Sequence, residues 1–354
     1  MFRLRDRDAI ITKEGIIFRV YGYFHPPTGY ICDVEYASAK IYNSKDPRAP
    51  RKRGSEVFYK FYADEGLKFV TEKFPKYTVF YKPLQKRLVG VKNDLIFKVR
   101  KPEEKLQELL AEEPKDELLF SLHDLLSLII SSSTLSTRNF GVFGSLLHSF
   151  YHPRLSDLDL IIYGKRNLKE LCEVLNEIYK EADSPLKNEF EDERVMEGKN
   201  WHFLNYSIKE FLRYQRRKAI YAVFDSKVAE RKVKVEFEPV KEWNEIYNEY
   251  EKTRRITCEG WIKAIARILS DEENAFMPSI YPIEIVKILE GPRTVEIERI
   301  ISYVEEFRMQ AFKDELVYVE GNLEKVEIED KVFHQITLTY GPKYYEQVLK
   351  TLTA

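Results

Sequence analysis

The most informative part of the sequence is Phe143-Gly144-Ser145, followed after eleven residues by Asp157-Leu158-Asp159-Leu160. Residues 158–163 are mostly apolar, which predicts a short buried strand. Successive side chains of a strand point to opposite faces. Asp157 and Asp159 are therefore expected to share one face, while the two leucines enter the core on the other.

The residue types in this stretch suit a phosphate group held by a metal ion. Gly144 allows the backbone to approach a ligand closely, and Ser145 opens a predicted short helix whose free N–H groups favour a phosphate. Two carboxylates held side by side repel each other unless a cation lies between them. Mg²⁺ binds through one or two carboxylates together with substrate phosphates, so we expect Asp157 and Asp159 to hold it.

Around this stretch, the pattern alternates between strands and helices. Apolar and β-branched segments predict strands at 140–143, 158–163, 220–224 and 232–238. Helical spacing of the apolar residues predicts helices at 103–111, 116–131, 145–150, 168–179 and 208–218. Such alternation is typical of an α/β domain, which we predict over residues 101–250, with the helices of 103–131 leading into it.

The two flanks differ from this central part. Residues 1–100 and 251–354 contain runs of β-branched and aromatic residues separated by turn signals such as Pro26-Pro27-Thr28-Gly29. We therefore predict a β-rich, barrel-like module on each side of the central domain.

Residues 143–160 resemble the signature of the DNA polymerase beta-like nucleotidyltransferases: an apolar residue, two small residues, a spacer of about ten residues, and Asp-apolar-Asp-apolar. The resemblance implies a mixed α/β, α+β fold in which that catalytic domain lies between the two β-rich modules. It also implies a third carboxylate on a neighbouring strand, for which Glu236 is the first candidate. The family more often has Asp there, so this position departs from the pattern, and Glu238 and Asp225 remain alternatives.

The activity that the resemblance implies is nucleotidyl transfer with two metal ions. Asp157, Asp159 and the third carboxylate would hold two Mg²⁺ ions, with Mn²⁺ as the alternative ion. Gly144 and Ser145 would contact the β- and γ-phosphates of a nucleoside triphosphate (NTP).

A narrower resemblance extends over most of the chain. Residues 5–9 and 22–26, together with Ser156-Asp157-Leu158-Asp159, are similar to a family of uncharacterised archaeal predicted nucleotidyltransferases. This resemblance implies no particular substrate.

Two basic clusters are candidates for binding phosphate groups. The first lies on the predicted helix 208–218 and would contact the triphosphate or a nucleic-acid backbone, through Arg213, Arg216, Arg217 and Lys218. Its alternative is a solvated helix face with favourable charges near the C-terminus. The second is a loop that could guide RNA or DNA by charge or could simply be solvated, and it contains Lys45, Arg48, Arg51, Lys52 and Arg53. We take Arg216, Arg217 and Lys218 forward as nucleotide-binding candidates.

Composition narrows the class of protein. Of the 354 residues, 32% are charged, but the signs nearly cancel to a net charge of -1, which argues against a strongly basic nucleic-acid coat protein. Three well-separated cysteines support neither a disulfide framework nor a paired-cysteine zinc site. We see no signal segment and no stretch suited to span a bilayer, so we expect a cytoplasmic protein without a membrane partner. Abundant Lys, Arg and Glu with little Gln is typical of thermophiles.

These observations predict a Mg²⁺-dependent nucleotidyltransferase that moves a nucleoside monophosphate from an NTP to an acceptor hydroxyl and releases pyrophosphate. RNA is the favoured acceptor, by analogy with transferases whose β modules hold a large substrate. A protein side chain or a small molecule is the alternative acceptor. The competing hypothesis is a non-catalytic nucleotide- or nucleic-acid-binding protein built on a degenerate transferase domain.

Overall fold

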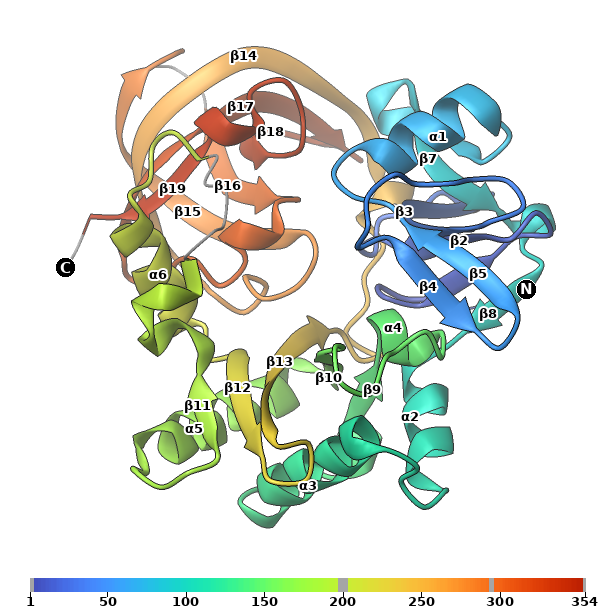
Figure 1. The fold of residues 1–354 in the computed structure, drawn as a ribbon. Helices are drawn as coiled ribbons and strands as arrows, with labels where there is room; N and C mark the ends of the chain where they lie inside the picture. The colour runs from blue at the N-terminus through green and yellow to red at the C-terminus, as the bar shows by residue number, and fades with distance from the viewer. Residues whose placement is uncertain (1–2, 197–202, 293–295, 353–354) are drawn as a thin grey trace. The chain divides into compact units, whose positions relative to one another are not determined.

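The computed structural model describes residues 3–196, 203–292 and 296–352, which form two compact units (Figure 1). The first unit contains residues 1–80, 87–189 and 219–246, and the second contains residues 81–86, 190–218 and 247–354. In the described part of the chain, no helix is long and apolar enough to cross a bilayer.

The predicted fold class is wrong. Strands account for 38% of the chain and helices for 26%, and the strands include a closed five-stranded barrel and a half-barrel. This mostly β architecture does not fit the α+β core of a polymerase beta-type domain. The alternating segments between residues 139 and 250 do form strands and helices, but they are a minor part of the chain and are shared between the two units.

The N-terminal part of the first unit is an antiparallel sheet. Its strands are, in spatial order, β4 (Pro50–Arg53), β5 (Glu56–Lys60), β3 (Gly29–Ser38), β2 (Ile16–Val20), β1 (Ala9–Ile11) and β8 (Lys98–Arg100). Two more strands pair with each other, β6 (Thr78–Tyr81) and β7 (Lys86–Lys92), and β7 also pairs with β3. Helix α1 (Glu65–Lys73) packs against this sheet through Phe69 and Val70, which belong to its apolar core.

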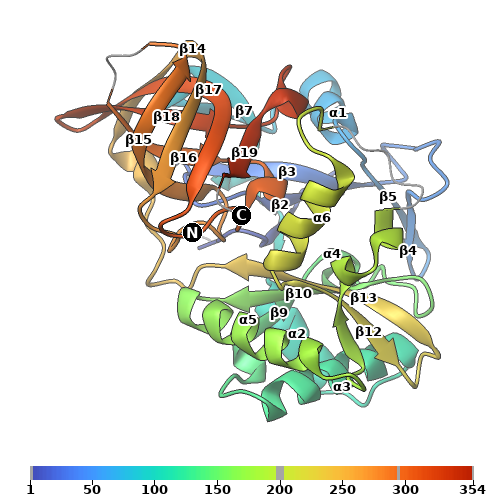
Figure 2. The same ribbon diagram turned by 90° about the vertical axis from the view of Figure 1, so that its left-hand side faces the viewer.

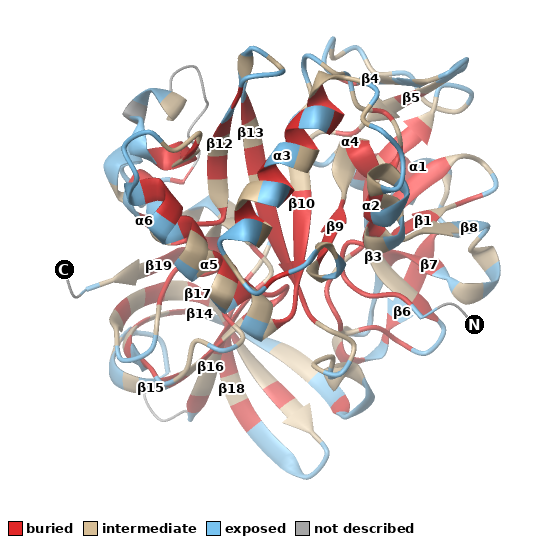
Figure 3. Cartoon of the chain, turned by 90° about the horizontal axis from the view of Figure 1, so that it is seen from below, coloured by how far each residue is buried: buried red, intermediate tan, exposed pale blue. Residues whose placement is uncertain are grey.

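The rest of the first unit is a five-stranded sheet. Its strands are, in spatial order, β11 (Leu186–Asn188), β12 (Tyr221–Ser226), β13 (Arg231–Val240), β10 (Leu158–Tyr163) and β9 (Phe140–Val142). Only β10 and β13 run parallel among these pairs. Both are largely buried, as their red colour in Figure 3 shows.

Three helices cover one face of the five-stranded sheet (Figures 1 and 2): α2 (Pro102–Leu110), α3 (Glu117–Ser131) and α5 (Lys165–Lys180). Asp116 caps the N-terminus of helix α3, where its carboxylate accepts hydrogen bonds from the N–H groups of Leu118 and Leu119. The apolar side chains of α3 recur at helical spacing and so lie on one face of the helix. They are buried: Leu118, Leu119, Leu122, Leu125, Leu126 and Ile129. The short helix α4 (Gly144–Leu147) lies on the opposite face, where Leu147 packs with Tyr36 and Phe58 of the N-terminal sheet.

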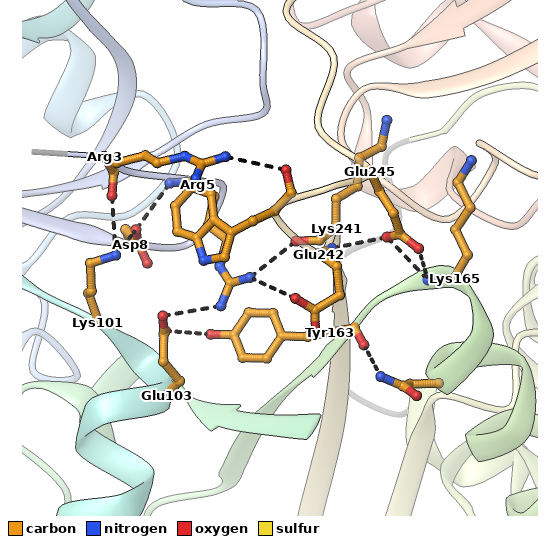
Figure 4. A network of polar contacts seen from close by, with 12 residues as sticks. Arg3, Arg5, Asp8, Lys101, Glu103, Tyr163, Lys165, Lys241, Glu242 and Glu245 are labelled. Atoms are coloured by element: carbon orange, nitrogen blue, oxygen red, sulfur yellow. Dashed lines mark hydrogen bonds and ion pairs between the residues drawn. The ribbon is translucent and has the colours of Figure 1, made fainter. Parts of the chain in front are cut away.

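A buried polar network joins the N-terminal segment to the ends of β10 and β13 within the first unit (Figure 4). The Arg5 guanidinium lies over the ring of Tyr163, 3.7 Å from its centroid, and donates to Glu103 at 3.1 Å and to the carbonyl of Lys241 at 3.3 Å. Tyr163 donates to Glu103 as well, at 2.9 Å. Asp8, which is fully buried, accepts from the N–H of Arg5 at 3.0 Å.

The second unit is built around a closed barrel. Its strands are β14 (Thr253–Ile268), β15 (Ser279–Glu290), β16 (Ile297–Ser302), β18 (Lys331–Leu338) and β17 (Leu316–Ile328), and β17 pairs back with β14 to close the circle. Strand β19 (Val348–Thr351) adds to β17, and helix α6 (Ile208–Arg217) joins the barrel core through Tyr214.

The connectivity of this barrel is informative. If β14 to β18 are numbered one to five in chain order, the strands lie around the barrel in the order 1-2-3-5-4-1. The third and fifth strands, β16 and β18, run parallel. This is the strand order of the OB-fold, a five-stranded Greek-key barrel. Strand order alone assigns no function.

Candidate functional site

Asp157 and Asp159 lie at the start of β10. Asp157 directly precedes the strand and is exposed, and Asp159 is its second residue and is half-buried. Leu158 and Leu160 have no exposed surface and form part of the core on the other face. The two aspartates therefore share a face because of the strand's two-residue repeat.

Gly144 lies against the carboxylate of Asp159. Its φ is +59°, in the left-handed region that favours glycine, and a Cβ atom at this position would collide with Oδ2 of Asp159. The backbone N–H of Phe143 donates to the carbonyl of Asp159 at 3.0 Å, which holds the two segments together. The glycine-serine turn thus lies beside Asp159, and Ser145 follows Gly144 in α4, partly exposed.

The short length of α4 alters the expected phosphate site. The helix has only four residues, so the aligned peptide dipoles of a longer helix are lacking. Any phosphate at Gly144 and Ser145 would be held by individual backbone N–H groups and by nearby cations.

Strand register distinguishes the three candidates for the third carboxylate. In the parallel pairing of β10 with β13, Asp159 lies directly opposite Glu236, and neighbouring strands are about 4.8 Å apart. Glu238 lies further along β13, is buried, and forms an ion pair with Arg7 at 2.6 Å. Asp225 is exposed on β12 and pairs with Lys232, four residue pairs away from Tyr221, which lies opposite Glu236.

The electrostatics of the site are dominated by burial and by like charge. Burial and the neighbouring Asp157 raise the pKa of Asp159 to about 7, although Lys60 and Lys234 act against this. Loss of water around the carboxyl also raises the pKa of Asp157, against the opposing charges of Lys234, Arg231 and Lys60. Two acidic groups that resist ionisation side by side are suited to a shared cation.

The three candidate ligands are of a type that hard divalent cations prefer. Asp157, Asp159 and Glu236 offer carboxylate oxygens, the ligand type that Mg²⁺ prefers, and Mg²⁺ commonly takes further oxygens from water and substrate phosphates. Among the residues that the structure describes, no group of three or more His, Cys, Asp or Glu side chains is placed so that it could hold a metal ion by itself. The two aspartates and Glu236 are therefore candidate ligands only, and a bound phosphate would have to supply further oxygen ligands to the ion.

Three basic residues of the site were not predicted. Arg231 donates to the carbonyl of Ser156 at 2.7 Å and so fixes the loop that leads into Asp157. Lys234 lies two residues before Glu236 on β13 and pairs with Glu189 at 3.2 Å. The alternation of β13 could have suggested Lys234, whereas Lys60 comes from the N-terminal sheet and no local signal pointed to it.

The structure places the predicted nucleotide-binding residues Arg216, Arg217 and Lys218 in the second unit. Arg216 donates to the carbonyl of Phe190 at 2.9 Å, and Arg217 forms an ion pair with Glu315 at 2.5 Å. Lys218 is fully buried and donates to the carbonyl of Glu306 at 2.7 Å. All three therefore have structural partners within that unit.

The chain is similar in sequence to an archaeal protein. The chain is 25% identical over 327 residues to the uncharacterized protein MJ1086 of Methanocaldococcus jannaschii, and the match covers 92% of each chain. No family model matches the chain, and no solved structure matches it significantly.

Proposed function

We propose that this chain is a divalent-cation-dependent nucleotidyltransferase, which moves a nucleoside monophosphate from an NTP to an acceptor hydroxyl and releases pyrophosphate. One observation carries the proposal. The Asp159 carboxylate lies against the φ-positive Gly144 and directly opposite Glu236 in strand register. This arrangement supports a site that can hold a cation and a phosphate together.

Each residue of the site has a distinct role in this proposal. Asp157 and Asp159 would hold the cation, with Glu236 as the third ligand, and Gly144 leaves room for the Asp159 carboxylate beside the backbone. When bound, Mg²⁺ would neutralise the phosphates and lower the pKa of the acceptor hydroxyl. Arg231 would keep Asp157 in position through its hydrogen bond to Ser156.

RNA remains the acceptor that we favour. The OB-like strand order of the second unit supports this choice, since barrels of that kind bind oligonucleotides. Residues 247–354 carry more acidic than basic side chains, however, and an acidic surface does not favour a nucleic-acid backbone. Protein and small-molecule acceptors should therefore be assayed alongside RNA.

The test is transfer of label from α-³²P-labelled NTPs to an RNA oligonucleotide in the presence of Mg²⁺ or Mn²⁺, with protein and small-molecule acceptors in parallel. Wild-type protein should form product, and the double variant Asp157→Ala/Asp159→Ala should form none. Asp225→Ala removes a carboxylate from the same sheet, outside the site, and should remain active. Equal product from wild type and the double variant would rule out this site.

The third carboxylate has its own test. Glu236→Gln should lower activity by at least tenfold and leave thermal unfolding unchanged, because it removes a ligand at a half-buried position. Glu238→Gln should instead lower the free energy of unfolding by about 3 kcal/mol, because it leaves the buried Arg7 guanidinium less well compensated. If Glu238→Gln lost activity without losing stability, while Glu236→Gln stayed active, Glu238 would be the third ligand.

A further inference from the structure

One face of the N-terminal sheet is directed toward the segment that follows Gly144. Tyr36 of β3 lies directly opposite Lys60 of β5, so both side chains share a face, and Phe58 shares it two residues earlier on β5. The rings of Tyr36 and Phe58 pack against Phe150, with centroid distances of 5.4 and 4.8 Å. The N–H of Phe150 in turn donates to the carbonyl of Ser145 at 2.8 Å. Lys60 is therefore carried on the face that covers the glycine-serine turn.

Lys60 acts on the acidic pair without pairing with it. Its positive charge is close enough to act on both Asp157 and Asp159. Its ammonium lies 5.8 Å from the ring centroid of Tyr62 and, within the described part of the chain, forms no ion pair or hydrogen bond. Lys234, the other lysine that acts on both aspartates, already has Glu189 as a partner at 3.2 Å.

We propose that Lys60 binds the triphosphate of the donor nucleotide and that the N-terminal sheet thereby completes the active site. Because the Lys60 ammonium forms no ion pair with the residues that the structure describes, it is available to an anion, and a cation held by the two carboxylates would attract the same anion. A polyphosphate chain has enough charge to contact both. This inference rests on the proposed nucleotidyl transfer.

The neighbouring basic residues favour a compact triphosphate over an extended nucleic-acid backbone. Arg51 and Arg53 continue the same face of the hairpin β4–β5. Arg53 forms an ion pair with Glu56 at 2.5 Å, and Arg51 donates to the carbonyl of Pro50 at 3.0 Å. A continuous path of uncommitted cations, which a nucleic-acid backbone would follow, is therefore lacking at these two positions.

The test compares binding of ATP, inorganic tripolyphosphate, adenosine and an RNA oligonucleotide by titration calorimetry with Mg²⁺ present. Lys60→Gln should weaken ATP and tripolyphosphate binding by roughly tenfold or more, as expected for loss of one charge-assisted contact. Lys60→Arg should restore most of the affinity, and adenosine binding should not change. Lys52→Gln removes the same charge from the opposite face of the hairpin and should bind like wild type.

The possible failures are distinguishable. If Lys60→Gln binds ATP like wild type while Asp157→Ala/Asp159→Ala abolishes Mg²⁺-dependent binding, the role of Lys60 is refuted and the proposed function stands. If Lys60→Gln loses affinity for RNA alone, the triphosphate assignment is overturned in favour of an acceptor contact. If the wild-type protein binds no triphosphate, both proposals fall.

Discussion

Asp159 combines two conditions that make its charge sensitive to pH. It is half-buried near the start of β10, and Asp157 lies on the same face two residues earlier. Both effects favour the protonated form, and they raise its pKa to about 7. A group poised in this way changes charge within the physiological range.

This predicts a pH-dependent cation affinity. A carboxyl must lose its proton to bind a metal ion, so Mn²⁺ affinity should rise about tenfold per pH unit below 7 and level off above it. Mn²⁺ binding measured by electron paramagnetic resonance from pH 5.5 to 8.5 tests this. Asp159→Asn should weaken binding and flatten the profile, and Asp225→Asn should leave it unchanged. Constant wild-type affinity between pH 6 and 8 would contradict the argument.

The turn between β9 and α4 is the element on which the site depends most. Gly144 meets two requirements there, since it adopts a positive φ and leaves space for the Asp159 carboxylate. The atom that a side chain would meet is the end of a flexible carboxylate, which can rotate away. A substitution should therefore displace the carboxylate rather than prevent folding.

Gly144→Ala should accordingly fold and lose Mn²⁺ binding and transfer activity by at least tenfold. The control is Gly54→Ala in the hairpin β4–β5, where φ is +57° and a Cβ atom would meet nothing within 4 Å. Both variants carry the same backbone strain, roughly 1–2 kcal/mol, so their thermal unfolding should shift alike. Equal activity of the two variants would show that the clash with Asp159 does not affect catalysis.

At the scale of the whole molecule, the buried polar network ties chain segments that are far apart in sequence. Asp8 is fully buried, accepts from the N–H of Arg5, and lies 3.7 Å from the ammonium of Lys101. Burial is the largest effect on its carboxyl and raises its pKa to about 7, although Lys101 opposes this. The folded state therefore binds a proton at Asp8 more tightly than the unfolded state does.

Stability should consequently fall as pH rises. The contribution of Asp8 is fully present below about pH 4, its ordinary range, and is lost as pH rises through about 7, with a total change of roughly 4 kcal/mol. Asp8→Asn should therefore show a smaller decline than wild type in urea unfolding between pH 5 and 8. Asp330→Asn, at a fully exposed position, should keep the wild-type slope. Identical slopes for Asp8→Asn and wild type would contradict the prediction.

The division into two units also bears on what was predicted for residues 101–250. That range was expected to be one catalytic domain, with helix 208–218 presenting its basic side chains to the nucleotide. Helix α6 instead shares the apolar core of the barrel through Tyr214, and Arg217 pairs within the same unit. The basic residues of an amphipathic helix look the same in sequence whether they meet a ligand or a neighbouring carboxylate.

Local pattern was enough to determine several features of this protein. The two-residue repeat of a strand places Asp157 and Asp159 on one face and sends Leu158 and Leu160 into the core. The helical repeat likewise predicts the buried stripe of α3. These features depend on neighbours within a few residues, so the sequence by itself determines them.

Three features depend on tertiary contacts: the mostly β architecture, the register that sets Glu236 opposite Asp159, and the presence of Lys60 near the acidic pair. Glu236 and Glu238 share a face of β13, and register with β10 alone sets Glu236 opposite Asp159. Lys60 reaches the site because β3 and β5 pack over the segment after Gly144, almost one hundred residues away in sequence. Such contacts follow from strand pairing and packing between distant segments, which no periodicity in the chain encodes.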